Sequence, residues 1–150
     1  SSQWSYPISQ ERGCPEGWTQ VDCSCFLFQD EERQFADAES VCNILGGNLA
    51  SVHSALENAV IVQLNAAGTS DSSSDIWIGL HEAIEEGTFF WTDDSPVDFT
   101  NFKSDNDSGD CLAIENDDVL WDKDPCSVEN KFVCAREADQ RDPPYKSTNL

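Results

Sequence analysis

The sequence predicts one mixed α+β domain, with helices in its first half and short strands in its second half. Apolar residues recur at helical spacing in two early segments, and short apolar runs bounded by turn residues follow them. Seven cysteines in 150 residues indicate that disulfides brace the fold. With 39% hydrophobic residues the chain can bury a core of its own, and it contains no run of about 18 apolar residues that would span a membrane.

The chain is strongly acidic, with 29 acidic residues against 8 basic ones and a net charge of -21. A field of this sign repels polyanions, so we expect no binding to nucleic acid. It favours cations instead. The alternative is that most of these carboxylates form an ordinary solvated surface.

The cysteines show neither a Cys-x-x-Cys pair nor a matching set of histidines, which argues for disulfides rather than zinc. Disulfides form in oxidising compartments, so the sequence predicts a secreted, extracellular protein. No charged and apolar leader precedes Ser1, and we therefore expect that a signal peptide has been removed or left out. Residue patterns alone leave the pairing open, because six cysteines allow 15 pairings.

The first elements follow from local patterns. Residues 1–13 are polar and predict a flexible arm, and residues 25–28 predict a strand that enters the core. A helix is expected over residues 35–45, where Gly46 and Gly47 supply a left-handed stop. The residues on its expected buried face are Phe35, Ala38, Cys42 and Leu45.

A second helix is expected to start at Ser54, because Ser54 and Glu57 match a capping box. Its expected buried stripe is Leu56, Val60 and Leu64, and the serine-rich segment 68–75 is expected to form a loop after it.

Residues 76–80, Ile-Trp-Ile-Gly-Leu, predict a central strand that is covered on both faces, because this apolar run is short and rich in β-branched residues. The tail 136–150 is expected to be disordered. Four further strands are expected at residues 88–91, 111–114, 119–121 and 131–134.

The order of these short motifs resembles that of a known family. Cys-Pro-x-Gly-Trp at Cys14 is followed by Gly-Gly-x-Leu-Ala-Ser at Gly46 and by Trp-Ile-Gly-Leu at Trp77. Gly-x-Phe-x-Trp, Asp-Cys, Trp-Asp-x-x-x-Cys and Phe-Val-Cys come after them. Together they resemble the C-type lectin-like domain over residues 14–135. The phrase that begins at Gly46 is similar to secreted fish and invertebrate members, type II fish antifreeze proteins among them.

The resemblance implies a C-type lectin-like fold: two helices, two small antiparallel sheets and a long loop region that carries the ligand site, between an arm (1–13) and a tail (136–150). It also implies the disulfides Cys14–Cys25, Cys42–Cys134 and Cys111–Cys126. Cys23 is left over. Because Cys23 and Cys25 point to the same side of a strand, Cys14 could pair with either. We expect the odd cysteine, Cys23, to form an intermolecular disulfide in a homo- or hetero-oligomer.

The primary calcium and sugar site of the family is degraded in this chain. Sugar-binding members hold calcium with a Glu-Pro-Asn or Gln-Pro-Asp triplet and an Asn-Asp pair after a tryptophan, whereas residues 102–111 contain no proline. Asp122 keeps one oxygen ligand, but Lys123 follows where a second carboxylate is usual. Gly109 likewise stands where the family usually places an acid.

Acidic residues are nevertheless dense in this region. The carboxylates between residues 98 and 124 are Asp98, Asp105, Asp107, Asp110, Glu115, Asp117, Asp118, Asp122 and Asp124. Calcium is the cofactor that the resemblance implies, with candidate ligands Glu82, Glu86, Asp107, Asp110 and Asp122. The candidate ligand-binding loop residues are Asp105, Asn106, Glu115, Asn116, Asp122 and Lys123. Alternatively, these acids are solvated and screened by salt, and then calcium and magnesium would act alike.

The function predicted from these observations is non-enzymatic recognition of a carbohydrate. His53 and His81 are the only histidines, and each lies in a stretch that the fold explains. The first alternative is a derivative that binds a crystalline surface, either ice or a calcium mineral. The second is a protein-binding subunit of a disulfide-linked assembly.

Overall fold

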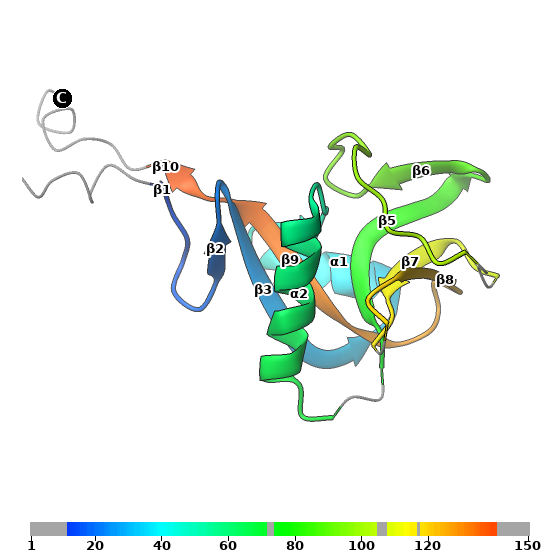
Figure 1. Ribbon diagram of the computed structural model, residues 1–150, viewed down its shortest axis with the longest axis horizontal. Coiled ribbons are helices and arrows are strands. Elements are labelled where there is room, and N and C mark those ends of the chain that lie inside the picture. The colour runs from blue at the N-terminus through cyan, green and yellow to red at the C-terminus, as the bar shows by residue number, and fades with distance from the viewer. Residues whose placement is uncertain (1–11, 72–73, 105–107, 117, 141–150) are drawn as a thin grey trace, which may run out of the picture.

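The computed structural model describes residues 12–71, 74–104, 108–116 and 118–140. The described residues form two helices and ten strands (Figure 1). In chain order these are β1 (Arg12–Gly13), β2 (Thr19–Val21), β3 (Ser24–Arg33), α1 (Phe35–Ile44), β4 (Asn48–Leu49), α2 (Ala55–Gly68), β5 (Ile76–Glu85), β6 (Thr88–Trp91), β7 (Cys111–Ile114), β8 (Trp121–Asp124), β9 (Asn130–Glu137) and β10 (Asp139–Gln140).

Eight of these strands form one sheet in the order β2-β3-β9-β5-β7-β8, with β4 paired to β9 and β6 paired to β5. Every pairing is antiparallel except that of β5 with β9, where Ile76 lies opposite Lys131 and Trp77 opposite Phe132. The two expected antiparallel groups are therefore present and are joined by this short parallel ladder. The second group, β5 to β8, forms one end of the molecule (Figure 1).

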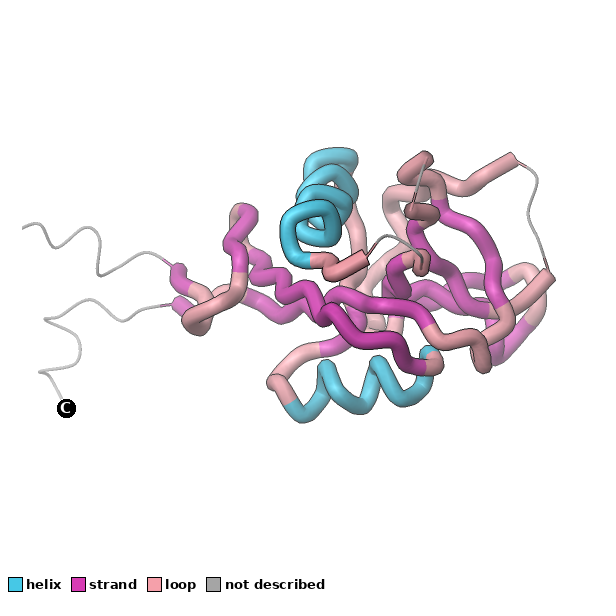
Figure 2. Tube along the Cα trace, turned by 90° about the horizontal axis from the view of Figure 1, so that it is seen from below, coloured by secondary structure: helices cyan, strands magenta, loops and turns pink. Residues whose placement is uncertain are grey.

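The two helices cover opposite sides of the strands (Figure 2). In α1 the residues Phe35, Ala38 and Cys42 are buried as predicted, whereas Leu45 is 39% exposed because the helix ends at Ile44. The chain then turns through Gly46, which has a φ of +93°. A Cβ atom on Gly47 would lie 2.2 Å from the Ala135 carbonyl oxygen, so this end of α1 packs directly on β9.

Helix α2 begins as predicted, because the Ser54 hydroxyl accepts the Glu57 N–H at 3.1 Å. Its buried stripe agrees with the predicted one only in part: Leu56 is 57% exposed, whereas Val60 and Leu64 are partly buried and Leu64 packs against the core. The fully buried positions are Asn58, Ile61 and Asn65. The apolar pattern placed the centre of the buried face away from its true position because two of the three fully buried residues are polar.

The central strand is buried on both faces as predicted. Ile76, Ile78 and Leu80 pack into one core cluster with Ile61, while Trp77 points into a second cluster on the other side. The strand continues beyond the expected end, to Glu85. One other strand begins later than predicted, at Trp121 instead of residue 119, because Val119 has a φ of +58° that no strand residue adopts.

Three disulfides brace the fold and join the pairs that the resemblance implies. Cys14–Cys25 links the first turn to β3, Cys42–Cys134 ties α1 to β9, and Cys111–Cys126 closes the segment around β7 and β8. The Cys23 thiol is free and exposed.

The domain boundaries need a correction on both sides. Strand β9 continues to Glu137, and β1 pairs with β10 beyond it, so residues 12–13 and 136–140 belong to the fold rather than to an arm and a tail. The rest of the expected arm and tail lies outside the described residues.

Candidate functional site

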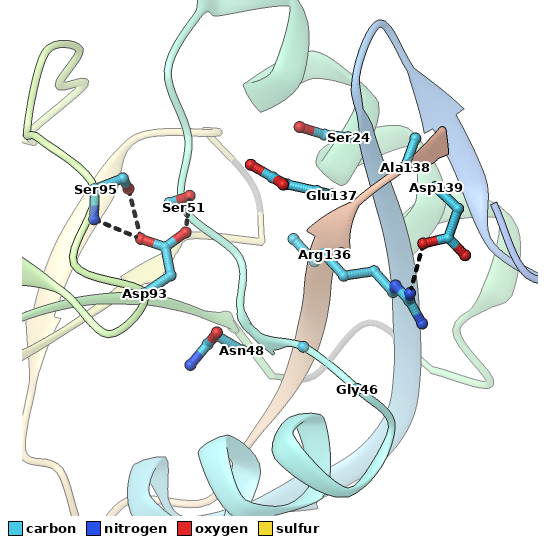
Figure 3. A pocket seen from close by; sticks show the side chains of 12 residues that line it. Ser24, Gly46, Asn48, Ser51, Asp93, Ser95, Arg136, Glu137, Ala138 and Asp139 are labelled. Carbon is cyan, nitrogen blue, oxygen red and sulfur yellow. Dashed lines mark hydrogen bonds and ion pairs between the residues drawn. The ribbon is translucent and has the colours of Figure 1, made fainter. Parts of the chain in front are cut away.

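Two regions offer polar side chains to a ligand, and the first is a cavity of about 670 Å³ beside β4 and β9 (Figure 3). On one wall the Asp93 carboxylate accepts hydrogen bonds from the Ser51 hydroxyl at 2.6 Å and from Ser95. On the other wall the Arg136 guanidinium pairs with Asp139 at 3.2 Å. Asp93 and Arg136 are therefore already paired with other residues of the cavity, and none of the lining residues was predicted as a site from the sequence.

Behind that cavity, His53 joins an aspartate to two serines. Its Nδ1 atom lies 2.7 Å from Asp98 Oδ1, and its Nε2 atom lies 3.0 Å from the Ser51 hydroxyl and 3.1 Å from the Ser95 hydroxyl. The hydrogen bond from His53 lowers the pKa of Asp98. The order Asp-His-Ser resembles a hydrolase triad, but both hydroxyl protons are donated to Asp93. Asp93 thus competes with the His53 Nε2 atom for both serine protons, which disfavours activation of either serine as a nucleophile.

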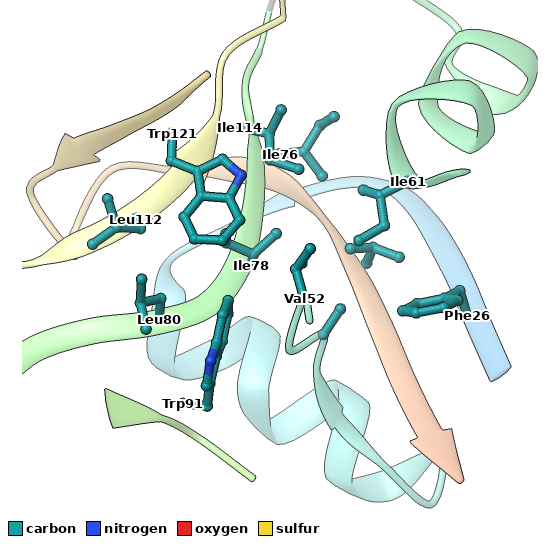
Figure 4. Packing of buried hydrophobic residues seen from close by; sticks show 12 residues of the cluster. Phe26, Val52, Ile61, Ile76, Ile78, Leu80, Trp91, Leu112, Ile114 and Trp121 are labelled. Atoms are coloured by element: carbon teal, nitrogen blue, oxygen red, sulfur yellow. The ribbon is translucent and has the colours of Figure 1, made fainter. Parts of the chain in front are cut away.

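The second region is the loop region around β5, β6 and β8, which rests on an aromatic cluster. Trp91 and Trp121 are buried and lie 5.7 Å apart between ring centroids, edge to face (Figure 4). Phe102 lies 5.8 Å from Trp121 and 5.1 Å from Phe89. The two of these pairs that include Trp121 are edge to face and add to the stabilisation that burial provides, whereas the Phe89–Phe102 pair is tilted.

Backbone hydrogen bonds fix the loop that precedes β7 against β8. The Trp121 N–H donates to the Asn101 carbonyl at 2.9 Å, and the Lys103 N–H donates to the Trp121 carbonyl at 2.8 Å. The Trp121 indole N–H in turn donates to the buried Asn58 side chain on α2, at 2.7 Å. Lys103 and Trp121 are thus held in a defined relation to the helix and to the core.

The buried carboxylate of Glu82 is bound through both oxygens. Its Oε2 atom lies 2.8 Å from the Lys123 ammonium, and its Oε1 atom accepts the Gly87 N–H at 2.8 Å. These two contacts, the Lys123 bond first, lower the pKa of Glu82. The Lys123 ammonium also lies 5.7 Å from the ring centroid of Phe89, within the range of a cation–π interaction.

Glu115 is bound in the same manner by the other lysine of this region. Both of its oxygens lie 3.1 Å from the Lys103 ammonium, which raises the pKa of Lys103. Burial raises the pKa of Glu115 to about 7, with the neighbouring Asp118 and Asp122 acting in the same direction and Lys103 opposing them. Several acids thus share one ammonium group at this position.

Of the remaining predicted site residues, Asp122 lies beside Glu115. Glu86 and Asp110 are exposed, although the Asp110 carbonyl accepts the Glu82 N–H at 2.9 Å. Asp122 is buried, and Asn116 bonds to Asp75 through its N–H. Asp105, Asn106 and Asp107 lie outside the described residues.

Within the part of the chain that the structure describes, no three His, Cys, Asp or Glu side chains are grouped to hold a metal ion. Sequence reasoning missed Asn58 and the role of Lys103. The signal for Lys103 was available, because Lys103 and Lys123 are the only basic residues between positions 98 and 124, where nine acidic residues lie.

No helix in the described residues is long and apolar enough to cross a membrane.

Comparison with known proteins agrees with this architecture. Residues 31–136 match the family model of the lectin C-type domain. The galactose-specific lectin nattectin of Thalassophryne nattereri is 32% identical over 128 residues, which cover 82% of this chain and 80% of the lectin.

The type-2 ice-structuring protein of Hemitripterus americanus is 34% identical over 137 residues, covering 86% of this chain and 79% of that protein. Among solved structures, a calcium-independent type II antifreeze protein superposes with a TM-score of 0.75 at 30% identity. That match covers 85% of this chain and 96% of the other.

Proposed function

The chain belongs to the family of C-type lectin domains, and from this premise we propose that it is a secreted, non-enzymatic recognition protein that binds carbohydrate weakly through its loop region. The three disulfides support an extracellular location, because such bonds persist in oxidising compartments. His53 lies between Asp98 and two serines whose hydroxyl groups are bonded to Asp93, and this arrangement supports a role without catalysis.

The observation that carries this proposal is the fixed surface formed by residues 101–103 and β8. Backbone bonds and the aromatic cluster beneath hold this surface in place, so a ligand does not have to order it on binding. Of the side chains here, Lys103 and Lys123 are partly exposed and can donate to hydroxyl groups, whereas Asp122 is buried and both Glu115 oxygens are bonded to Lys103. The calcium-binding triplet is absent, so few strong contacts are available to one sugar.

A glycan array tests this function directly. We expect binding to extended or multivalent glycans, and monosaccharide affinities in the millimolar range, equivalent to about −4 kcal/mol. A loop variant, Lys123→Gln, should reduce the array signal at a temperature at which its melting curve shows it to be folded, whereas Arg136→Gln in the cavity beside β9 should leave the signal unchanged. Absence of any glycan signal for the native chain, or an equal loss with both variants, would count against the loop site.

A second candidate function is binding to a crystalline surface. It is favoured by the similarity to a calcium-independent type II antifreeze structure at a TM-score of 0.75 and by the type-2 ice-structuring relative. Ice binding predicts thermal hysteresis, and mineral binding predicts altered calcium carbonate growth. Activity in either assay without a glycan signal would favour this candidate over the lectin function.

A third candidate is a protein-binding subunit of a disulfide-linked assembly, which the exposed Cys23 thiol favours. It predicts a covalent oligomer that reduction separates.

A further inference from the structure

We infer that the ammonium groups of Lys103 and Lys123 neutralise two carboxylates of the loop region, so that this region keeps its structure without calcium. This inference concerns the folded loops and holds whichever ligand the domain binds. It rests on two carboxylates that are each withdrawn from solvent and each paired with one lysine from a different element.

The first pair is Glu82 with Lys123. The Glu82 side chain is only 3% exposed, and removing one partner of a buried ion pair leaves an uncompensated charge. Lys123 comes from β8 and Glu82 from β5, and the two strands are separated in the sheet by β7. The 2.8 Å contact between their side chains therefore crosses β7 and fixes the end of the sheet that carries the loops.

The second pair is Glu115 with Lys103. The Glu115 side chain is 15% exposed, and the Lys103 ammonium reaches both of its oxygens. Lys103 follows Phe102, whose backbone forms an isolated bridge with Trp121. The ion pair thus joins the loop that precedes β7 to the turn between β7 and β8.

The two carboxylates that these lysines bind do not fit a calcium ion. Calcium takes roughly six to eight oxygen ligands at about 2.3–2.6 Å, whereas one Glu82 oxygen is bonded to an ammonium and the other to the Gly87 N–H. Both Glu115 oxygens are bonded to Lys103. An ion placed at either carboxylate would meet an ammonium at close range, and like charges repel. Ligand contacts in this region would then come from hydrogen bonds and packing rather than from metal coordination.

Thermal unfolding tests the inference in two steps. The melting temperature of the native chain should be the same, at equal ionic strength, in calcium, in magnesium and in EDTA. Lys123→Gln and Lys103→Gln should each lower it, and Lys123→Gln by roughly 6 °C or more, because a buried carboxylate loses its partner. The matched control is Arg33→Gln, which breaks the exposed Arg33–Glu31 pair at 2.7 Å and should lower it by less than about 4 °C.

The double variant Glu82→Gln with Lys123→Gln separates lost charge compensation from lost packing. If the inference holds, the double variant melts above Lys123→Gln alone, because both charges are gone. A native chain that calcium stabilises by several degrees over magnesium would overturn the inference. So would a Lys123→Gln effect no larger than that of Arg33→Gln. If Lys123→Gln does not fold, a folded double variant supports the inference and an unfolded one refutes it.

Discussion

Asn58 offers a direct test of how the core positions the loop region. It lies on α2, it is 6% exposed, and its side-chain oxygen accepts the indole N–H of Trp121 at 2.7 Å. Its amide also lies 3.4 Å from the Val119 carbonyl, at the turn that leads into β8. Replacing Asn58 with leucine keeps the number and branching of the side-chain heavy atoms but removes the acceptor for a fully buried donor.

The expected cost follows from that unsatisfied donor. A buried polar group that loses its partner costs about 1–3 kcal/mol, and we expect Asn58→Leu to lower the free energy of unfolding by about 2 kcal/mol. For a chain of 150 residues this corresponds to a melting temperature about 6 °C lower. The β8 end should loosen first, because Trp121 also anchors Asn101 and Lys103 through its backbone.

Urea unfolding followed by tryptophan fluorescence measures this change, and Asn43→Leu is the control. Asn43 makes its two side-chain hydrogen bonds at the surface, where water can replace them. Combining Asn58→Leu with Trp121→Phe should cost less than the sum of the single changes, because both partners are then removed. If Asn58→Leu unfolds at the same urea concentration as Asn43→Leu, the assigned role of Asn58 is wrong.

Three further predictions follow from single contacts. Gly109→Ala should destabilise the fold strongly, because the residue has a φ of +139° and a Cβ atom would lie 2.2 Å from the Asp124 carbonyl carbon; chemical denaturation measures this. Native protein should run as a disulfide-linked oligomer on a non-reducing gel, and Cys23→Ser should run as a monomer with an unchanged melting temperature. In Asp30→Asn, the free energy of unfolding should fall less steeply as the pH is lowered. Lys131, 2.8 Å from Asp30, lowers the pKa of Asp30, so the pair stabilises the fold above about pH 4 and less as pH falls through the lowered folded-state pKa.

Each of these predictions has its own contrary result. Gly87→Ala is the control for Gly109, since Gly87 has a positive φ but open space around it, and equal losses would show that crowding does not matter. A native monomer with one thiol that alkylates would mean that Cys23 forms no intermolecular bond. If the native chain and Asp30→Asn lose the same free energy of unfolding as the pH falls, the Lys131 contact is not a source of acid sensitivity.

Much of the fold was accessible from local patterns. The central strand was predictable because a short apolar run between turns is typical of burial on both faces, and Ile76 and Trp77 do pack into separate clusters. The start of α2 was predictable from the Ser54 cap. Its buried face was not, because Asn58 and Asn65 are buried through partners that lie far along the chain.

The candidate site was harder to predict for a similar reason. Lys123 was expected to weaken a calcium site, but its partner could not be inferred, since Glu82 precedes it by 41 positions and reaches it only across the folded sheet. The absence of an acid at residue 109 has a steric cause that no sequence pattern contains. The backbone of Asp124 and Pro125 occupies the space that a side chain would need.

Direct measurement of calcium binding tests the central claim, that lysines replace the ion in this loop region. Equilibrium dialysis of the native chain at about 10 mM free calcium would saturate even a site of the extracellular type, whose dissociation constant is about 10⁻⁴–10⁻³ M. Excess magnesium removes the diffuse attraction of an acidic surface for divalent ions. We expect no bound calcium above the level of that background. The account would be contradicted if one calcium ion were bound per chain under these conditions, and if the Arg33→Gln control bound the same amount.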